Sequence, residues 1–169
     1  MGLFETTSAK PVAVHVLLPG FVVRGQLPVI GTLQTYLNDE RRGTFSLNNV
    51  TVYGLEPGNP ARSMQLEGLF VAKRSCHAIL FDTILPQEET GLLPRTERLA
   101  IYTPHYCIQG DFHMGPDVLV GEFAFASRAQ FIGATTVQVF PLFPPQAALP
   151  QSAPLAFVHR DVLQMHHMV

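Results

Sequence analysis

The stretch Leu18-Pro19-Gly20-Phe21-Val22-Val23-Arg24-Gly25-Gln26-Leu27 decides the fold, because the chain contains a second version of it. Residues 103–112, Thr-Pro-His-Tyr-Cys-Ile-Gln-Gly-Asp-Phe, repeat its spacing. The matched positions hold residues of the same kind: Pro19 and Pro104, Phe21 and Tyr106, Val23 and Ile108, Gly25 and Gly110, and Leu27 and Phe112. The flanking elements also recur in the same order, so we expect an internal duplication.

Each version predicts a turn at the proline, followed by a strand whose alternate residues share one face. Residues 12–18 and 99–101 are rich in apolar residues and predict the strand that comes before each turn. Gly25 and Gly110 fall inside the returning strands, where a glycine is typical of sharp bending or of a close approach by another backbone. The pattern favours a small, strongly curved sheet.

The alternation stops after residue 31, where Leu33, Tyr36 and Leu37 have helical spacing and Thr32 is a candidate N-cap. In the second half, the apolar residues 117–127 take this place, either as core, which we favour, or as an oligomer interface. Further strands are predicted at residues 45–55, with a kink at Asn48-Asn49, and at residues 131–140. His166-His167 predicts a frayed polar tail.

These elements divide the chain into a first repeat at residues 10–81, a linker at 82–98 and a second repeat at 99–169. Each repeat holds about five strands and is small for independent stability. We therefore expect the two repeats to pack as one globular unit, or the chain to oligomerise.

Composition narrows the classes of protein that fit. Hydrophobic residues make up 47% of the 169 residues and charged residues 14%, which suits a packed core and excludes a disordered chain. The formal net charge of -2 lowers the expectation of phosphate-backbone binding. Cys76 and Cys107 make no disulfide framework and are expected to be buried thiols. With no signal-peptide pattern and no long apolar run, we expect a cytoplasmic protein.

The repeat resembles the Sm-like small β-barrel, which opens with a Gly-x-x-Val-x-Gly-x-Leu pattern. Gly20, Val23, Gly25 and Leu27 reproduce that pattern, and the second half keeps Ile108 and Gly110. The resemblance implies a mainly β fold of two tandem Sm-like (SH3-like) small barrels, with a short helix inserted in each repeat. The chain also looks like uncharacterised bacterial Sm-like domains that have no assigned chemistry.

The resemblance implies self-association, because Sm-like units join through edge-strand pairing into rings. Its RNA-binding signature is altered here. Where the family has Arg-Gly after two apolar residues, this chain has Ala72-Lys73 and His159-Arg160, and Gln34 replaces the Asp before Tyr36-Leu37-Asn38. The positions that would carry binding are Asn38, Arg41, Arg42, Lys73, Arg74, His159 and Arg160.

No catalytic or cofactor-binding pattern stands out. Cys76 and His77 are adjacent, so on a strand they point to opposite faces and cannot form a dyad. His105 and Cys107 share a strand face near His113, but a zinc site needs a further ligand, and we expect no metal and no cofactor. A Gly-x-Ser-x-Gly elbow and a phosphate-binding loop are both absent.

Three functions remain open. We rank first a non-catalytic assembly or binding module that self-associates through the edges of its sheet. An RNA-binding Sm-like protein comes second, and nucleic acid is possible as a partner but not favoured. The third is a small cysteine-dependent enzyme that uses Cys107 and a distant His.

Overall fold

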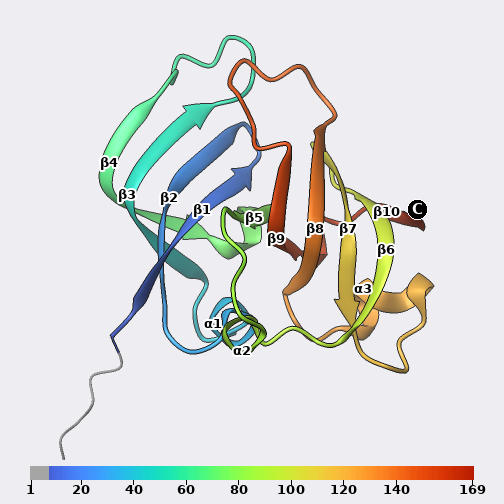
Figure 1. Cartoon of the computed structure of the whole chain (residues 1–169). Helices are drawn as coiled ribbons and strands as arrows, with labels where there is room; N and C mark the ends of the chain where they lie inside the picture. Colours follow the sequence, from blue (N-terminus) through green and yellow to red (C-terminus); the bar gives the residue numbers. More distant parts are fainter. Residues whose placement is uncertain (1–7) are drawn as a thin grey trace, which may run out of the picture.

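The computed structural model describes residues 8–169, and its strands lie in one antiparallel ten-stranded sheet (Figure 1). The first half of the chain contains the elements β1 (Lys10–Leu18), β2 (Phe21–Val29), α1 (Leu33–Leu37), β3 (Thr44–Gly54), β4 (Met64–Ala72), η1 (Lys73–Ser75) and β5 (Ala78–Phe81). The mainly β class is therefore confirmed. None of the helices within the described residues is long and apolar enough to cross a bilayer.

After a short helix in the linker, α2 (Gln87–Thr90), the strands of the second half follow in the same order as those of the first, with one additional 3-10 turn before the inserted helix. Its elements are β6 (Arg95–Tyr102), β7 (Tyr106–Met114), η2 (Val120–Glu122), α3 (Phe123–Ala126), β8 (Phe131–Pro141), β9 (Ser152–His159), η3 (Arg160–Val162) and β10 (Met165–Met168). Two expectations change. Strand β6 begins at Arg95, inside the predicted linker. His166-His167 lie in β10, which pairs with β6, so the prediction of a frayed tail was wrong.

The order of strands in the sheet is β10-β6-β7-β8-β9-β5-β1-β2-β3-β4. The strands of the first half lie on one side of the molecule and those of the second half on the other, with β5 and β9 meeting between them (Figure 1). We expected two tandem small barrels. Among the described residues the sheet instead stays open, because β4 and β10 end it at opposite edges.

Equivalent positions in the two halves follow from the strand registers. Asn48 pairs with Gly68 across β3 and β4, and Thr135 pairs with Leu155 across β8 and β9. The residue after each, Asn49 and Thr136, has a positive φ, of 51° and 52°. Below, residues at equivalent positions in the two registers are called counterparts.

Both halves bend at the glycine that the sequence singled out. The ladder between β2 and β3 shifts register between Arg24 and Gln26, and that between β7 and β8 shifts between Gln109 and Asp111. A Cβ on Gly25 would lie 3.2 Å from the Asn48 carbonyl oxygen, and one on Gly110 would lie 3.2 Å from that of Thr135. The predicted close backbone approach and the kink at Asn48-Asn49 are thus confirmed.

The short helices follow the sequence in part. The Thr32 side chain accepts a hydrogen bond from the Thr35 N–H and caps α1, as expected. In the second half, residues 117–127 form only η2 and the single turn of α3. Phe123 is buried there, but Leu119 and Phe125 are exposed, so core packing accounts for only part of this apolar segment.

The two halves share their cores. The core of the first half takes in three side chains from the second half: Phe131, Leu155 and Phe157. The core of the second half takes in five side chains from the first half: Leu17, Val22, Leu55, Ala78 and Leu80. Because each core is completed by the other half, the fold is one unit rather than two separable ones.

Candidate functional site

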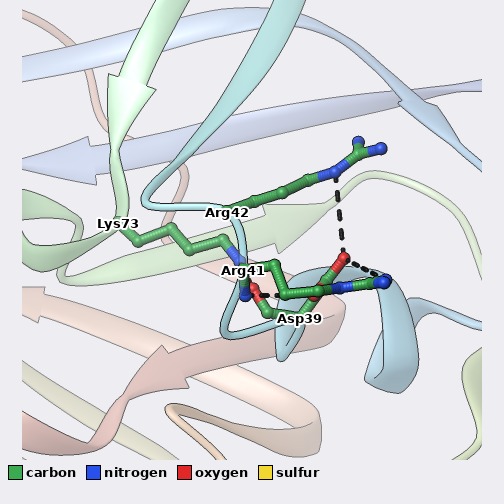
Figure 2. A network of polar contacts seen from close by, with 4 residues as sticks. All are labelled: Asp39, Arg41, Arg42 and Lys73. Carbon is green, nitrogen blue, oxygen red and sulfur yellow. Dashed lines mark hydrogen bonds and ion pairs between the residues drawn. The ribbon is translucent and has the colours of Figure 1, made fainter.

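The most polar cluster among the predicted site residues lies after α1, where Asp39 contacts two arginines (Figure 2). Arg41 Nε lies 2.9 Å from Asp39 Oδ1, and Arg42 Nε lies 3.8 Å from Oδ2. The hydrogen bonds from Arg41 lower the pKa of the Asp39 carboxyl to about 2. The two arginines are therefore partly neutralised by a carboxylate that stays ionised at neutral pH.

Lys73 belongs to the same cluster but is almost fully buried, with 3% of its surface exposed. Its Nζ donates to the backbone oxygen of Asp39 at 2.9 Å, and its backbone N–H donates to the Gly43 oxygen at 2.9 Å. Burial lowers the pKa of this amine. Lys73 thus holds the loop after α1 against η1 and presents little charge to solvent.

Arg160 is the counterpart of Lys73 and plays the same part in the second half. Its Nη1 donates to the Ser127 carbonyl oxygen at 2.5 Å, and its backbone N–H donates to the Gln130 oxygen at 2.7 Å. In both halves, a basic side chain at the start of a 3-10 turn therefore fastens the loop that follows the inserted helix. Arg74 lies exposed on η1.

Asn38 and His159 meet at one residue, Phe131. The Asn38 Oδ1 accepts from the Phe131 N–H at 2.7 Å, and Asn38 Nδ2 donates to the Phe131 oxygen at 3.2 Å. The His159 ring stands edge-on to the Phe131 ring with centroids 5.0 Å apart, and burial lowers the pKa of His159. Asn38 therefore ties the end of α1 in the first half to β8 in the second half, whereas the His159 ring packs on Phe131 within the second half.

Burial and hydrogen bonds limit the reactivity of the two cysteines and of His113. Both thiols are buried, and burial raises the pKa of Cys76 and of Cys107. His113 is occupied, because Nδ1 lies 2.6 Å from the Leu93 oxygen and Nε2 lies 3.1 Å from Thr135 Oγ1. Within residues 8–169, no three His, Cys, Asp or Glu side chains are placed to hold a metal ion.

The most distinctive surface is the pair of open sheet edges, which the predicted site residues do not include. Large apolar side chains are exposed at both ends: Phe70, on β4, is 79% exposed, and Met165 and Met168, on β10, are 60% and 64% exposed. Their counterparts in the middle of the sheet, Phe157, Ala78 and Phe81, are fully buried. Extending the repeat alignment through the last residues of the chain gives this correspondence from sequence alone.

The junction between β5 and β9 shows what a covered edge looks like in this fold. Ala78 lies opposite Val158, Ile79 opposite Phe157, Leu80 opposite Ala156 and Phe81 opposite Leu155. The rings of Phe81 and Phe157 pack edge-to-face with centroids 5.9 Å apart. Next to this ladder, the loop before β9 reaches the first half, where Gln146 donates its backbone N–H to the Leu55 oxygen at 2.8 Å.

Comparison with known proteins adds no relative to these observations: no family model, no curated protein and no solved structure matches the chain.

Proposed function

We propose that this protein is a non-catalytic assembly module, built from two Sm-like halves, that self-associates through its open edge strands β4 and β10. The observation that carries the proposal is the contrast between side chains at the internal junction and their counterparts at the edges. Phe157, Ala78, Phe81 and Leu55 are fully buried, whereas their counterparts Phe70, Met165, Met168 and Leu142 are 79%, 60%, 64% and 52% exposed.

The two edges are expected to match each other, because they are the counterparts of two strands that already pair inside the chain. The pair β5 and β9 joins the halves inside the chain, and their counterparts are β10 and β4. The β10 edge of one molecule can therefore pair with the β4 edge of the next as β5 pairs with β9. Such a head-to-tail contact closes into a ring or extends into a filament.

We propose that this contact has the register of the internal junction. In that register Met165 lies opposite Val71, His166 opposite Phe70, His167 opposite Leu69 and Met168 opposite Gly68. In that register Phe70 lies beside Met168, as Phe157 lies beside Phe81, and a sulfur–aromatic contact replaces the aromatic pair.

The energetics favour a reversible contact. Burying Phe70, Met165, Met168 and Leu142 stabilises the complex by about 1.5–3 kcal/mol for each side chain. The loss of free motion on association costs about 4–15 kcal/mol, which is similar to the sum of these gains. We therefore expect the mass to rise with protein concentration.

Binding of RNA receives less support from the same residues. Lys73 and Arg160 direct their side chains to backbone oxygens of their own loops, and Asp39 partly neutralises Arg41 and Arg42. If RNA is nevertheless the ligand, nucleic acid copurifies and leaves at high salt, and Arg41→Ala weakens binding.

The first test is the native mass by light scattering over a range of protein concentrations and at two salt concentrations, with nucleic-acid absorbance read alongside. Growth with concentration in the absence of nucleic acid supports the proposal. Phe70→Glu, which places a charge on the β4 edge, is expected to yield a monomer. Ile84→Glu, at a linker side chain that is 84% exposed, serves as its matched control.

Disulfide crosslinking tests the pairing itself. At the internal junction His159 N–H donates to the His77 oxygen, so the neighbouring pair Ala78–Val158 and the pair Leu80–Ala156 are the close, non-hydrogen-bonded ones. Mixing Leu69→Cys with His167→Cys is therefore expected to crosslink two chains, and neither variant alone should do so. Crosslinking of Leu69→Cys to itself would instead indicate a symmetric edge and contradict head-to-tail pairing.

A further inference from the structure

The internal junction has a second component besides its strand ladder, namely the end of α1 seated on the start of β8. Asn38, the C-cap of α1, binds the backbone of Phe131, the first residue of β8. Beside it, Gln34 and Leu92 enclose a cavity of about 350 Å³ together with Phe131 and Gly133. Leu92 lies so close to Gly133 that a Cβ there would overlap its side chain.

At the open edge of the first half, the equivalent place is a hollow. Thr44, the counterpart of Phe131, begins β3, and the ladder from β2 reaches β3 only as far as Asn48. A space of about 380 Å³ lies there, lined by Thr44, Ser46 and Phe70 and by the basic residues of Figure 2: Arg41, Arg42 and Lys73. Phe70 is 79% exposed at this hollow.

The element equivalent to α1 in the second half is α3, which also lies between the second and third strands of its half and has Ser127 as its C-cap. One turn is too short to cover much surface by itself. It nevertheless carries Phe125, whose exposed fraction of 81% exceeds that of Phe70. One end of the molecule therefore has the hollow beside Phe70, and the other end has the end of α3 with the exposed Phe125.

We propose that the hollow beside Phe70 receives the C-terminal end of α3 from a second copy of this chain, with Phe125 packed on Phe70 and Ser127 facing the start of β3. This inference rests on the proposed head-to-tail association. The proposed contact lies outside the strand ladder. It would adjoin the β10–β4 ladder in the same way as the contact between α1 and β8 adjoins the β5–β9 ladder. Both aromatic side chains leave water on assembly, which favours the contact.

The test is a double-mutant cycle on the association constant, measured by sedimentation equilibrium. Phe125→Ala is expected to weaken association about tenfold, because one exposed aromatic side chain no longer becomes buried. The double variant Phe70→Ala with Phe125→Ala is expected to associate only slightly more weakly than the Phe70→Ala variant, by much less than tenfold. The reason is that the effects of substituting two residues in contact are not additive. Circular dichroism verifies that each variant is folded.

Met64→Ala provides the matched control, because Met64 is exposed on β4 at the end remote from Phe70. Its effect is expected to multiply with that of Phe125→Ala without coupling. If Phe125→Ala associates like the wild-type protein, or if the effects of Phe125→Ala and Phe70→Ala are additive, the contact between α3 and the hollow is refuted while self-association stands. A wild-type protein that stays monomeric at every concentration overturns both proposals.

Discussion

The side-chain amide of Asn38 pairs with both backbone polar groups of Phe131, a residue 93 positions away in the chain. Its Nδ2 also donates to the Gln34 oxygen at 2.9 Å. One side chain therefore ties the end of α1 in the first half to the first residue of β8 in the second half. Asn38 fastens the halves together, although in sequence it resembles part of a binding loop.

Asn38→Ala is expected to lower the free energy of unfolding by about 1–3 kcal/mol, because a partly buried N–H and carbonyl lose their partner. Urea denaturation measures the change. Asn38→Asp keeps the acceptor for the Phe131 N–H but places a carboxylate oxygen against the Gln34 and Phe131 carbonyl oxygens, so it is also expected to lose stability. Equal stability of Asn38→Ala and the wild-type protein would contradict the fastening role.

Gly110→Ala is expected to destabilise the fold by about 1–3 kcal/mol. The added Cβ would lie 3.2 Å from the Thr135 oxygen and 3.2 Å from Val137 Cγ2, both in the strand facing the bend. Gly121→Ala is the control, because nothing lies within 4 Å of a Cβ there. Thermal unfolding of both variants decides the matter: similar melting temperatures would mean that the bend tolerates a side chain.

Stability is expected to fall as the pH drops from about 6.5 to about 4. Burial, with smaller contributions from the charges of His105 and His159, lowers the pKa of His77 from 6.5 to about 4. In this window the unfolded chain binds more protons at His77 than the folded chain, so the stability present above pH 6.5 is lost on acidification. The loss from this group amounts to about 3 kcal/mol.

Denaturation curves at several pH values measure this loss, and His77→Gln is expected to show a shallower decline. Burial also lowers the pKa of His159, which contributes in the same direction. The stability of the variant is therefore still expected to depend on pH. A decline identical to that of the wild-type protein would show that His77 binds protons equally in the folded and unfolded chains, and would contradict the lowered pKa.

Neither cysteine of the native protein is expected to react quickly with a thiol reagent. Cys76 is fully buried and Cys107 is 6% exposed, and burial raises the pKa of both thiols, so little thiolate is present at neutral pH. Reaction with a chromogenic disulfide checks this, with the protein in denaturant as the control in which both react. Fast native labelling of Cys107 would revive a cysteine-dependent enzyme.

The sequence by itself determined the local elements. Alternation of apolar residues gave the strands, Thr32 marked the start of α1, and Gly25 and Gly110 marked the bends, because these features depend on a few neighbouring residues. The matched spacing of the two halves predicted the shared order of elements for the same reason.

Only the tertiary structure decided which strands pair and which side chains point inward. His166-His167 looks like a polar tail, yet backbone pairing with β6 makes it a strand, and this pairing depends on residues far away in the chain. Lys73 and Arg160 look like surface charges, yet their hydrogen bonds to loop carbonyls turn them inward. The pairing of β10 with β6 and the inward direction of these two basic side chains depend on residues far away in the chain, which a local sequence pattern does not specify.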